Sequence, residues 1–456
     1  MGLPSLNYVI AAIATPPGKG AVGIVRVSGN GSLELVSRLW QGKNPCKLSG
    51  GRFTHGKIRD PNTQEILDEA LLLVFRQPHS YTGQDSAELH THGSPAVLRR
   101  VLHTLLELGA RPAQPGEFTL RAYLNGKMDL AQAEAVLNLV ESESDAARRQ
   151  ALRGLSAGLS QKIANLSEQL FTLLAHIQAW LDYPEEGVEP VQIQAALEPV
   201  LQEIQHLLAT APAGRIAQKG ARIALVGAPN AGKSSLLNAL LRMDRAIVTP
   251  IPGTTRDTLE ETLNLQGVPF VLVDTAGIVH AAADLVEQLG IERSRRAVRQ
   301  ADLVLVVVDG SEPLRAEDHA IAELTEGRAA IVVINKCDLP TVADVAGFLP
   351  GARRVRISAL IGEGLDNLRA AMLELAMGGE VMSSNGILVS SVRHKEALAR
   401  ALGHLEKAEV TYRQGLPADF VTIDLRAAAD ALGEITGQTV TPDLLDHIFA
   451  NFCIGK

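Results

Sequence analysis

The stretch "GAPNAGKSS", which begins at Gly227, constrains the fold of this chain more than any other. It fits the phosphate-binding pattern G-x-x-x-x-G-K-S, and it lies between an apolar run, "ARIALV", and a run typical of a helix, "SLLNALL". Glycines let the backbone amides of such a loop turn toward phosphates, and the helix that follows adds its positive end. Apolar strands alternate with amphipathic stretches over residues 221–376, so we expect a parallel sheet with helices on both faces.

The residue types in this loop predict which side chains contact the nucleotide and its metal ion. Lys233 would reach the β- and γ-phosphates of a bound nucleotide, and the hydroxyl group of Ser234 would bind Mg²⁺. The predicted nucleotide contacts within the loop are Asn230, Ala231, Gly232, Lys233, Ser234 and Ser235.

Two motifs that could sense the γ-phosphate come next along the chain. "GTTRD" (253–257) contains Thr255, a switch threonine expected to bind Mg²⁺. "DTAG" (274–277) follows the strand-like "FVLV" and would place Asp274 near the metal and a backbone amide near the γ-phosphate. The predicted contacts in this part are Thr249, Pro250, Ile251, Pro252, Gly253, Thr254, Thr255, Asp274, Thr275, Ala276 and Gly277.

The base is expected to bind to two later motifs. In "NKCD" (335–338), Asp338 can accept both N–H donors of guanine, and adenine would leave this carboxylate unpaired. "SAL" (358–360) would supply a backbone amide for the guanine oxygen. The predicted contacts are Asn335, Lys336, Asp338, Ser358, Ala359 and Leu360. Five motifs in this order predict a GTPase.

The residue that activates water is less obvious. Ile278 stands where many small GTPases have a glutamine that orients the attacking water. Glu287 is a candidate for this role, and an exposed acid on a helix is the alternative. No arginine finger in cis is obvious, since Arg256 is possible but lies beside the magnesium threonine Thr255. A monovalent cation could replace an arginine finger, because the amide oxygen of Asn230 is a group that K⁺ accepts.

Length and composition limit the remaining possibilities. A chain of 456 residues suggests two to four domains, and its three distant cysteines argue for a reducing, cytoplasmic location. No apolar run is long enough for a membrane span, and we expect no signal peptide. The net charge of −8 disfavours a protein coated with nucleic acid, although "RRQALRG" (148–154) and "RSRRAVR" (293–299) are locally basic.

The order of strand-like and helical segments along the sequence predicts a multidomain α+β protein. Residues 1–120 carry short β-like runs, and residues 218–377 form the α/β P-loop unit. Helical periodicity marks residues 121–217 and 378–456 on either side of it, as in the spacing of Leu130, Ala133, Leu137 and Val140. We therefore expect a Ras-like α/β domain inserted into one all-helical domain, preceded by an α+β domain.

Longer blocks of the sequence resemble one family. "ATPPGKGAVGIVRVSG", "PGEFTLRAYLNGKMDLAQAEAV", "IVTPIPGTTRD", "VEQLGIER" and the terminal "FCIGK" are similar to the MnmE family, also called TrmE, of tRNA-modification GTPases. The nucleotide motifs occur in many GTPases, whereas these flanking blocks are far more specific. The resemblance extends almost from end to end of the chain.

The resemblance implies a function with several components. Family members are homodimers in which the counterpart of residues 1–120 binds a tetrahydrofolate, in the 5-formyl or methylene form, as a one-carbon donor. With an FAD-containing partner, MnmG or GidA, they form a heterotetramer that adds an aminomethyl or carboxymethylaminomethyl group to C5 of the wobble uridine of certain tRNAs. K⁺ promotes dimerisation of their GTPase domains.

The resemblance also implies individual residue roles. By matching position, the K⁺ ligands would be Asn230, Thr249, Ile251 and Thr254, and Glu287 would be the catalytic glutamate. The folate contacts would be Arg26, Glu88, Lys127 and Lys456. The chain departs from the family pattern next to Glu88, with Gln84, an additional His90 and Ser94. His90 and His92 could be metal ligands, but no third ligand accompanies them at metal spacing.

The carboxyl-terminal residues allow three interpretations of Cys453. A prenylation box would need aliphatic residues after the cysteine, but Gly455 and Lys456 stand there. A reactive thiol stays open because Lys456 is close in sequence. Packing of Cys453 beside Phe452 and Ile454 is the interpretation that we favour. The polar end of the tail is expected to return to the folate domain.

Two other classes of GTPase compete with a modifying enzyme. An RNA-binding switch in ribosome assembly would leave residues 1–120 and the tail without a purpose, and no RNA-binding signature follows the GTPase motifs. A membrane-remodelling GTPase would need a basic amphipathic or apolar tip, whereas the helical segments have the pattern of ordinary core-forming helices.

Overall fold

The structure is a computed structural model, and it describes residues 6–183, 192–244, 261–273, 295–378 and 387–456. The chain forms two compact units. The first comprises Met1–Leu137, Leu155–Leu174 and Arg426–Lys456, and the second comprises Asn138–Gly154 and Ala175–Leu425. The domain boundaries expected from the sequence stay a prediction. Within the described ranges, no helix combines the length and the apolar character that a membrane span requires.

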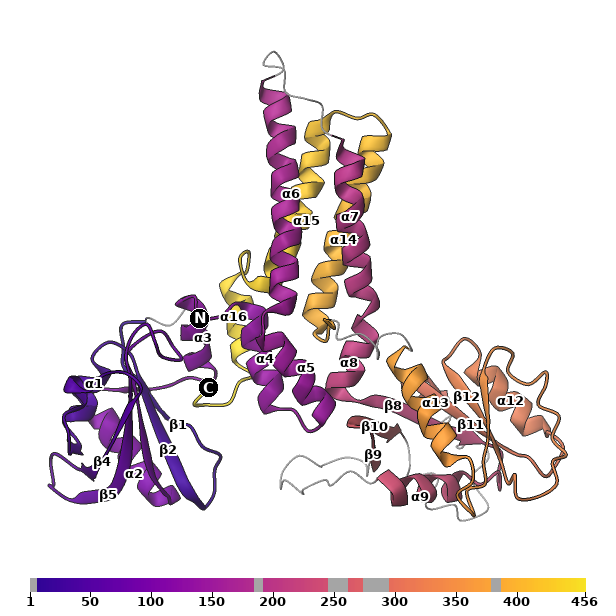
Figure 1. Cartoon of the computed structure of the whole chain (residues 1–456), viewed down its shortest axis with the longest axis horizontal. Helices are drawn as coiled ribbons and strands as arrows, with labels where there is room; N and C mark the ends of the chain where they lie inside the picture. Colours follow the sequence, from indigo (N-terminus) through magenta and orange to yellow (C-terminus); the bar gives the residue numbers. More distant parts are fainter. Residues whose placement is uncertain (1–5, 184–191, 245–260, 274–294, 379–386) are drawn as a thin grey trace. The chain divides into compact units, whose positions relative to one another are not determined.

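The first unit contains a seven-stranded sheet with the strand order β3-β4-β5-β6-β2-β1-β7 (Figure 1). Its strands are β1 (Ile10–Ile13), β2 (Gly20–Ser28), β3 (Trp40–Gln41), β4 (Arg52–Arg59), β5 (Ile66–Phe75), β6 (Ser86–Gly93) and β7 (Arg111–Pro112). All neighbours are antiparallel except β1 and β7. Alternating side chains give this sheet two different faces.

One face of this sheet is buried under α1 (Ser32–Ser37) and α2 (Pro95–Glu107), with Val25 and Leu72 in the core between them. The other face carries a row of paired residues across four strands. Leu73, Glu88, Arg26 and Ala12 are cross-strand neighbours in this order. Ala12 packs with Phe118 of α3 (Glu117–Leu124). The register therefore brings Arg26 and Glu88 to the same face as α3.

Further helices lie on either side of the α/β part in sequence. They are α4 (Leu130–Val140), α5 (Asp145–Leu155), α6 (Gly158–Asp182), α7 (Ile193–Ala209), α8 (Ala211–Lys219), α14 (Val392–Arg413), α15 (Ala418–Thr436) and α16 (Pro442–Phe449). A short 3₁₀ turn, η1 (Pro45–Lys47), precedes β4. The helix predicted at the position of α4 is confirmed, and Leu130 and Ala133 are fully buried, but Val140 on the same predicted face is 47% exposed. In the second unit, α7 and α14 pack side by side (Figure 1).

The second unit contains a six-stranded sheet with the order β13-β12-β11-β8-β10-β9. Its elements are β8 (Ala221–Gly227), α9 (Lys233–Asp244), β9 (Glu261–Leu265), β10 (Val268–Val273), β11 (Leu303–Asp309), α12 (Ala316–Thr325), β12 (Ala330–Asn335), β13 (Arg353–Arg356) and α13 (Leu365–Met377). Its strands are parallel apart from β9 and β10.

Both faces of this second sheet are buried. On β11, Leu305 belongs to the core that also contains Leu236 of α9 and Leu368 of α13, whereas Val306 belongs to the opposite core with Val298. Near-continuous apolar strands are typical of such a doubly covered parallel sheet. The α/β fold class is therefore confirmed, and β8 and β12 end at the edge of the sheet where ligands bind in this architecture.

Candidate nucleotide and cofactor sites

The phosphate-binding loop connects β8 to α9. Gly232 has a φ of +95°, and Asn230 has a φ of 64°. A Cβ atom on Gly232 would lie 2.1 Å from Nδ2 of Asn335, so any larger residue would have to displace that side chain. Glycine is thus required here both by backbone conformation and by the close approach of Asn335.

Lys233 lies at the first turn of α9 and points back to the loop. Its ammonium group donates to the carbonyl oxygens of Gly227 at 2.9 Å and Ala228 at 2.8 Å. Burial lowers the pKa of Lys233, and attraction by Asp318 partly opposes this decrease. The backbone therefore holds a cation beside the loop, where phosphate oxygens can replace the two carbonyls.

Asn335 links the phosphate loop to the base motifs. Its Nδ2 donates to the carbonyl of Ala231 at 2.9 Å, and its Oδ1 accepts from the backbone N–H of Ala359 at 3.0 Å. The next residue, Lys336, has a φ of 62° and forms an ion pair with Asp309 at the end of β11. Three of the predicted motifs are therefore joined by the two ends of one buried amide.

The base-binding residues differ in exposure. Ser358 is fully buried, and its backbone N–H donates to the carbonyl of Glu363 at 2.9 Å. Asp338 is exposed, and Leu360 is 84% exposed. A carboxylate open to solvent is accessible to a base. The predicted contacts Thr249, Pro250, Ile251, Pro252, Gly253, Thr254, Thr255, Asp274, Thr275, Ala276 and Gly277, and also Glu287, lie outside the described residues.

A second candidate site forms in the first unit, where the carboxyl-terminal tail docks. The backbone N–H of Phe118 donates to the carbonyl of Lys456 at 3.1 Å. Gly455 has a φ of +95°, and a Cβ atom there would lie 2.7 Å from the carbonyl oxygen of Ile13. Phe452 anchors the tail by packing in a small core with Phe449. The return of the tail to this part of the chain is confirmed.

Arg26 is the central residue of this tail site. Its Nε donates to Oε1 of Glu88 at 2.8 Å, and its Nη1 donates to the carbonyl of Gly455 at 3.1 Å. The second carboxylate oxygen of Glu88 lies 3.1 Å from Nε2 of His90. The guanidinium also lies over the rings of Tyr81 and Phe118, 5.8 and 5.6 Å from their centroids. One arginine thus joins two strands, two aromatic rings and the tail.

The two predicted folate-site lysines have different surroundings. Lys456 is half-buried, and both its burial and the nearby charge of Arg26 lower its pKa. Lys127 is exposed, and its Nζ donates to the carbonyl of Pro78 at 3.0 Å. The structure therefore brings Arg26, Glu88 and Lys456 together and places Lys127 beside the preceding loop.

Sequence analysis missed Tyr81 at this site. Its hydroxyl group bonds to Oγ1 of Thr119 at 2.9 Å, and burial raises its pKa. Its aromatic side chain within "SYTGQ", a Gly-containing loop, was an available signal, but the stacking on Arg26 depends on a tertiary contact.

One favoured interpretation is wrong, and one alternative that the sequence left open gains no support. The favoured packing of Cys453 is wrong, because its side chain is exposed, as is that of Ile454 at 61%; of these three neighbours, Phe452 alone is buried. The metal alternative for the histidines gains no support, because His90 pairs with Glu88 and His92 pairs with Asp68 at 2.8 Å. Across the described ranges no three His, Cys, Asp or Glu side chains gather as metal ligands do.

Comparison with known proteins agrees with this arrangement. The family model described as the MnmE helical domain matches residues 130–453, and the model of the amino-terminal part of the GTP-binding protein TrmE matches residues 9–127. A tRNA modification GTPase MnmE from Thermus thermophilus is 54% identical over 452 residues, which are 99% of this chain and 100% of that protein. Its counterpart from Roseiflexus sp. strain RS-1 is 47% identical over 98% of this chain and 99% of its own length.

The α/β fold and the phosphate loop define a P-loop GTPase. The matched family models and the full-length relatives specify the class further. The chain belongs to the MnmE family of tRNA modification GTPases.

Proposed function

We propose that this chain hydrolyses GTP and couples hydrolysis to the addition of an aminomethyl or carboxymethylaminomethyl group to C5 of the wobble uridine in certain tRNAs. A tetrahydrofolate bound in the first unit is the one-carbon donor. The FAD-containing protein MnmG is the partner. The observation that carries this proposal is the docked tail, because it places Lys456 beside Arg26 and Glu88.

The charges at the tail site suit a folate. A pterin ring presents neighbouring N–H donors, and the carboxylate of Glu88 can accept two of them in place of its present hydrogen bond with His90. The cationic groups of Arg26 and Lys456 suit the anionic glutamate tail of a folate. A bound folate would supply the one-carbon unit, while these residues bind and orient it.

In the second unit, Lys233 would bind the β- and γ-phosphates, and Ser234 would hold Mg²⁺ together with Thr255. Asn230 would contribute to the K⁺ site, and Glu287 would orient the attacking water. Thr255 and Glu287 lie outside the described residues. Asn230, the proposed cation ligand, has a positive φ, which is uncommon for a residue other than glycine and occurs often at functional sites.

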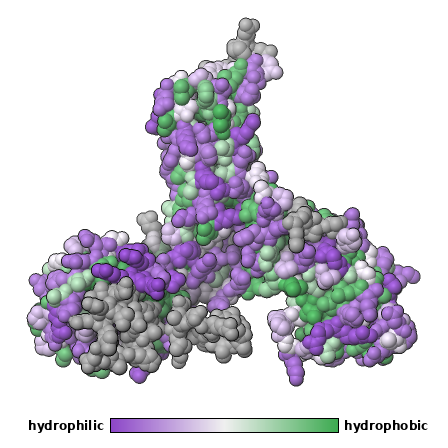
Figure 2. All heavy atoms as spheres, turned by 180° about the vertical axis from the view of Figure 1, so that it is seen from behind, coloured by the Kyte–Doolittle hydropathy of each residue, from purple (hydrophilic) through white to green (hydrophobic). Residues whose placement is uncertain are grey.

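We also propose that the chain forms a homodimer, and an exposed apolar surface supports this. Phe53 of β4 and Leu71 of β5, on neighbouring strands, are 72% and 40% exposed on the face that carries Arg26 and Glu88. Val22 of β2, on the same face, is 56% exposed. Figure 2 shows hydrophobic residues gathered on the surface of this part of the chain. Apolar patches of this kind on a water-exposed sheet are typical of protein interfaces.

The folate component can be tested by calorimetric titration of 5-formyltetrahydrofolate into the full chain. We expect Glu88→Gln to weaken binding by about tenfold or more, since it removes the charge that accepts paired N–H donors. Glu69→Gln is the matched control, because Glu69 is an exposed acid on the same sheet that pairs with His55. Equal affinity in wild type and Glu88→Gln would contradict the folate assignment.

A further inference from the structure

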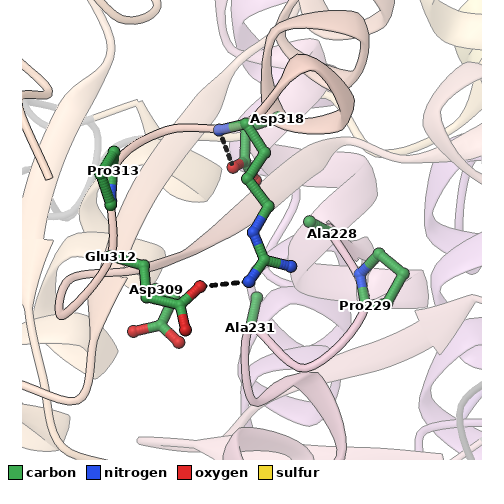
Figure 3. Close-up of a pocket in the computed structure, with 8 residues that line it drawn as sticks. Ala228, Pro229, Ala231, Asp309, Glu312, Pro313 and Asp318 are labelled. Atoms are coloured by element: carbon green, nitrogen blue, oxygen red, sulfur yellow. Dashed lines mark hydrogen bonds and ion pairs between the residues drawn. The ribbon is translucent and has the colours of Figure 1, made fainter.

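A pocket lies directly beside the phosphate-binding loop. Ala228, Pro229 and Ala231 of the loop form one wall, and residues 309–318 form the other (Figure 3). The charged residues that line the second wall are Asp309, Glu312, Arg315 and Asp318. None of them belongs to the motifs that predict nucleotide binding.

Three of these four charges have a partner of opposite sign. Asp309 pairs with Lys336, and Glu312 pairs with Arg315. Asp318 is 5% exposed, and its Oδ2 accepts a hydrogen bond from the backbone N–H of Arg315 at 2.9 Å. Its Oδ1 is buried and has no hydrogen-bond partner among the residues that the structure describes. Among the described residues, Asp318 is therefore the one charged residue of this pocket that forms no ion pair, although its charge attracts Arg315 and Lys233.

Capping of α12 does not require this charge. One oxygen of Asp318 completes the capping box at the start of the helix, and the amide oxygen of an asparagine or glutamine can accept the same bond. The positive end of the helix favours an acid here, but an unpaired buried oxygen is costly. An effect of the negative charge other than helix capping would account for a carboxylate at this position.

The charge of Asp318 acts on the phosphate loop. Its attraction opposes the decrease that burial causes in the pKa of Lys233. In the structure, Lys233 binds the carbonyls of Gly227 and Ala228, and Ala228 also lines the pocket. Phosphates that attract Lys233 would therefore have to compete with its attraction to Asp318. The negative charge of Asp318 would also repel the phosphates.

We propose that the carboxylate of Asp318 weakens the binding of guanine nucleotides through repulsion of the phosphates and attraction of Lys233, and so promotes nucleotide release. Burial makes this repulsion effective, because a buried charge is screened less by water and salt than an exposed one. Asp318 is a tuning residue in this role. The inference rests on the proposed GTP binding at this loop and is independent of the folate and potassium assignments.

The test is equilibrium binding and release of three fluorescent nucleotides, GMP, GDP and a non-hydrolysable GTP analogue, by the full chain. We expect Asp318→Asn to tighten GDP binding by about fivefold, with a larger gain for the GTP analogue and a smaller one for GMP, because repulsion grows with phosphate charge. The gain should appear mainly as slower release. Asp318→Gln is a second neutral variant, since glutamine is a common residue at this capping position.

Two controls isolate the buried charge. Asp318→Glu keeps the charge and should bind all three nucleotides as the wild type does. Glu317→Gln makes the same charge change on the exposed neighbouring residue and should alter affinity by less than about twofold. Unchanged or weaker binding in both neutral variants, or an equal gain for GMP and the GTP analogue, would overturn the inference. Failure of the wild type to bind any nucleotide would instead overturn the GTPase assignment on which the inference depends.

Discussion

The nucleotide site takes its described loop from one stretch of chain, residues 227–235, whereas the tail site gathers Arg26, Glu88 and Lys456 from distant parts of the sequence. In the first case the backbone amides of the loop are the proposed phosphate ligands, and local residues such as Gly232 set the conformation of this loop. In the second case the register of a sheet and the docking of the chain end create the site. A local sequence motif can therefore identify the former, but not the latter.

The strongest test of this contrast removes the tail. Deletion of Ile454–Lys456 should abolish tRNA modification and the binding of 5-formyltetrahydrofolate, because Arg26 loses its contact with Gly455 and the site loses Lys456. GTP hydrolysis should be unaffected, since the phosphate loop lies in the other unit. Both activities can be measured on the same preparation. Loss of basal hydrolysis in the truncated chain would contradict the separation of the two sites.

A single substitution sharpens this test. Gly455→Ala places a Cβ atom 2.7 Å from the carbonyl of Ile13 at a φ of +95°, so we expect undocking of the tail and at least about a tenfold loss of folate affinity. Ile454→Ala, at an exposed position in the same tail, is the matched control and should bind folate normally. Normal binding by Gly455→Ala would mean that the tail does not form the site.

The corresponding substitution in the nucleotide site replaces Gly232 of the phosphate loop. Gly232→Ala should lower GTP affinity by about 100-fold, roughly 2.7 kcal/mol, because its Cβ atom would displace Asn335 and distort the loop. Folate binding should be unchanged. Fluorescent-nucleotide titration alongside folate calorimetry measures both. A parallel loss of folate affinity would show that the comparison between two independent sites is wrong.

The fold of the second unit could be predicted from sequence because its determinants are local. The continuous apolar run of β11 and the spacing of the phosphate loop each lie within one short segment. The tail site could be expected only through the family resemblance, because no local pattern reveals that Arg26 pairs with Glu88, 62 residues away. The exposure of Cys453 could not be foreseen either, because it depends on how the tail docks through Gly455 and Lys456.

Monovalent cations should affect only one of the two sites. With K⁺ bound at the predicted ligands Asn230, Thr249, Ile251 and Thr254, hydrolysis should be about tenfold faster in KCl than in NaCl at equal ionic strength, as expected for a cation that offsets transition-state charge. Folate affinity should not differ between the salts. Equal hydrolysis rates would remove the potassium assignment.

A smaller effect is expected from pH. The lowered pKa of Lys456 means that this lysine loses its charge at a lower pH than an ordinary lysine does. Folate affinity should therefore decline as the pH rises through this pKa, while Lys456→Arg should keep its affinity over the same range because arginine stays protonated. Calorimetry at several pH values measures the decline. Identical pH profiles for wild type and Lys456→Arg would exclude Lys456 as the titrating group.

The most direct test of the central claim is nucleoside mass spectrometry of bulk tRNA from cells that lack this protein, complemented with the wild type, Gly455→Ala or Gly232→Ala. If the two sites serve one modification, only the wild type should restore C5-aminomethyl-type wobble uridines. Unchanged wobble uridines in the deletion strain, with a defect in ribosomal subunits instead, would contradict the proposed function and favour an RNA-binding switch.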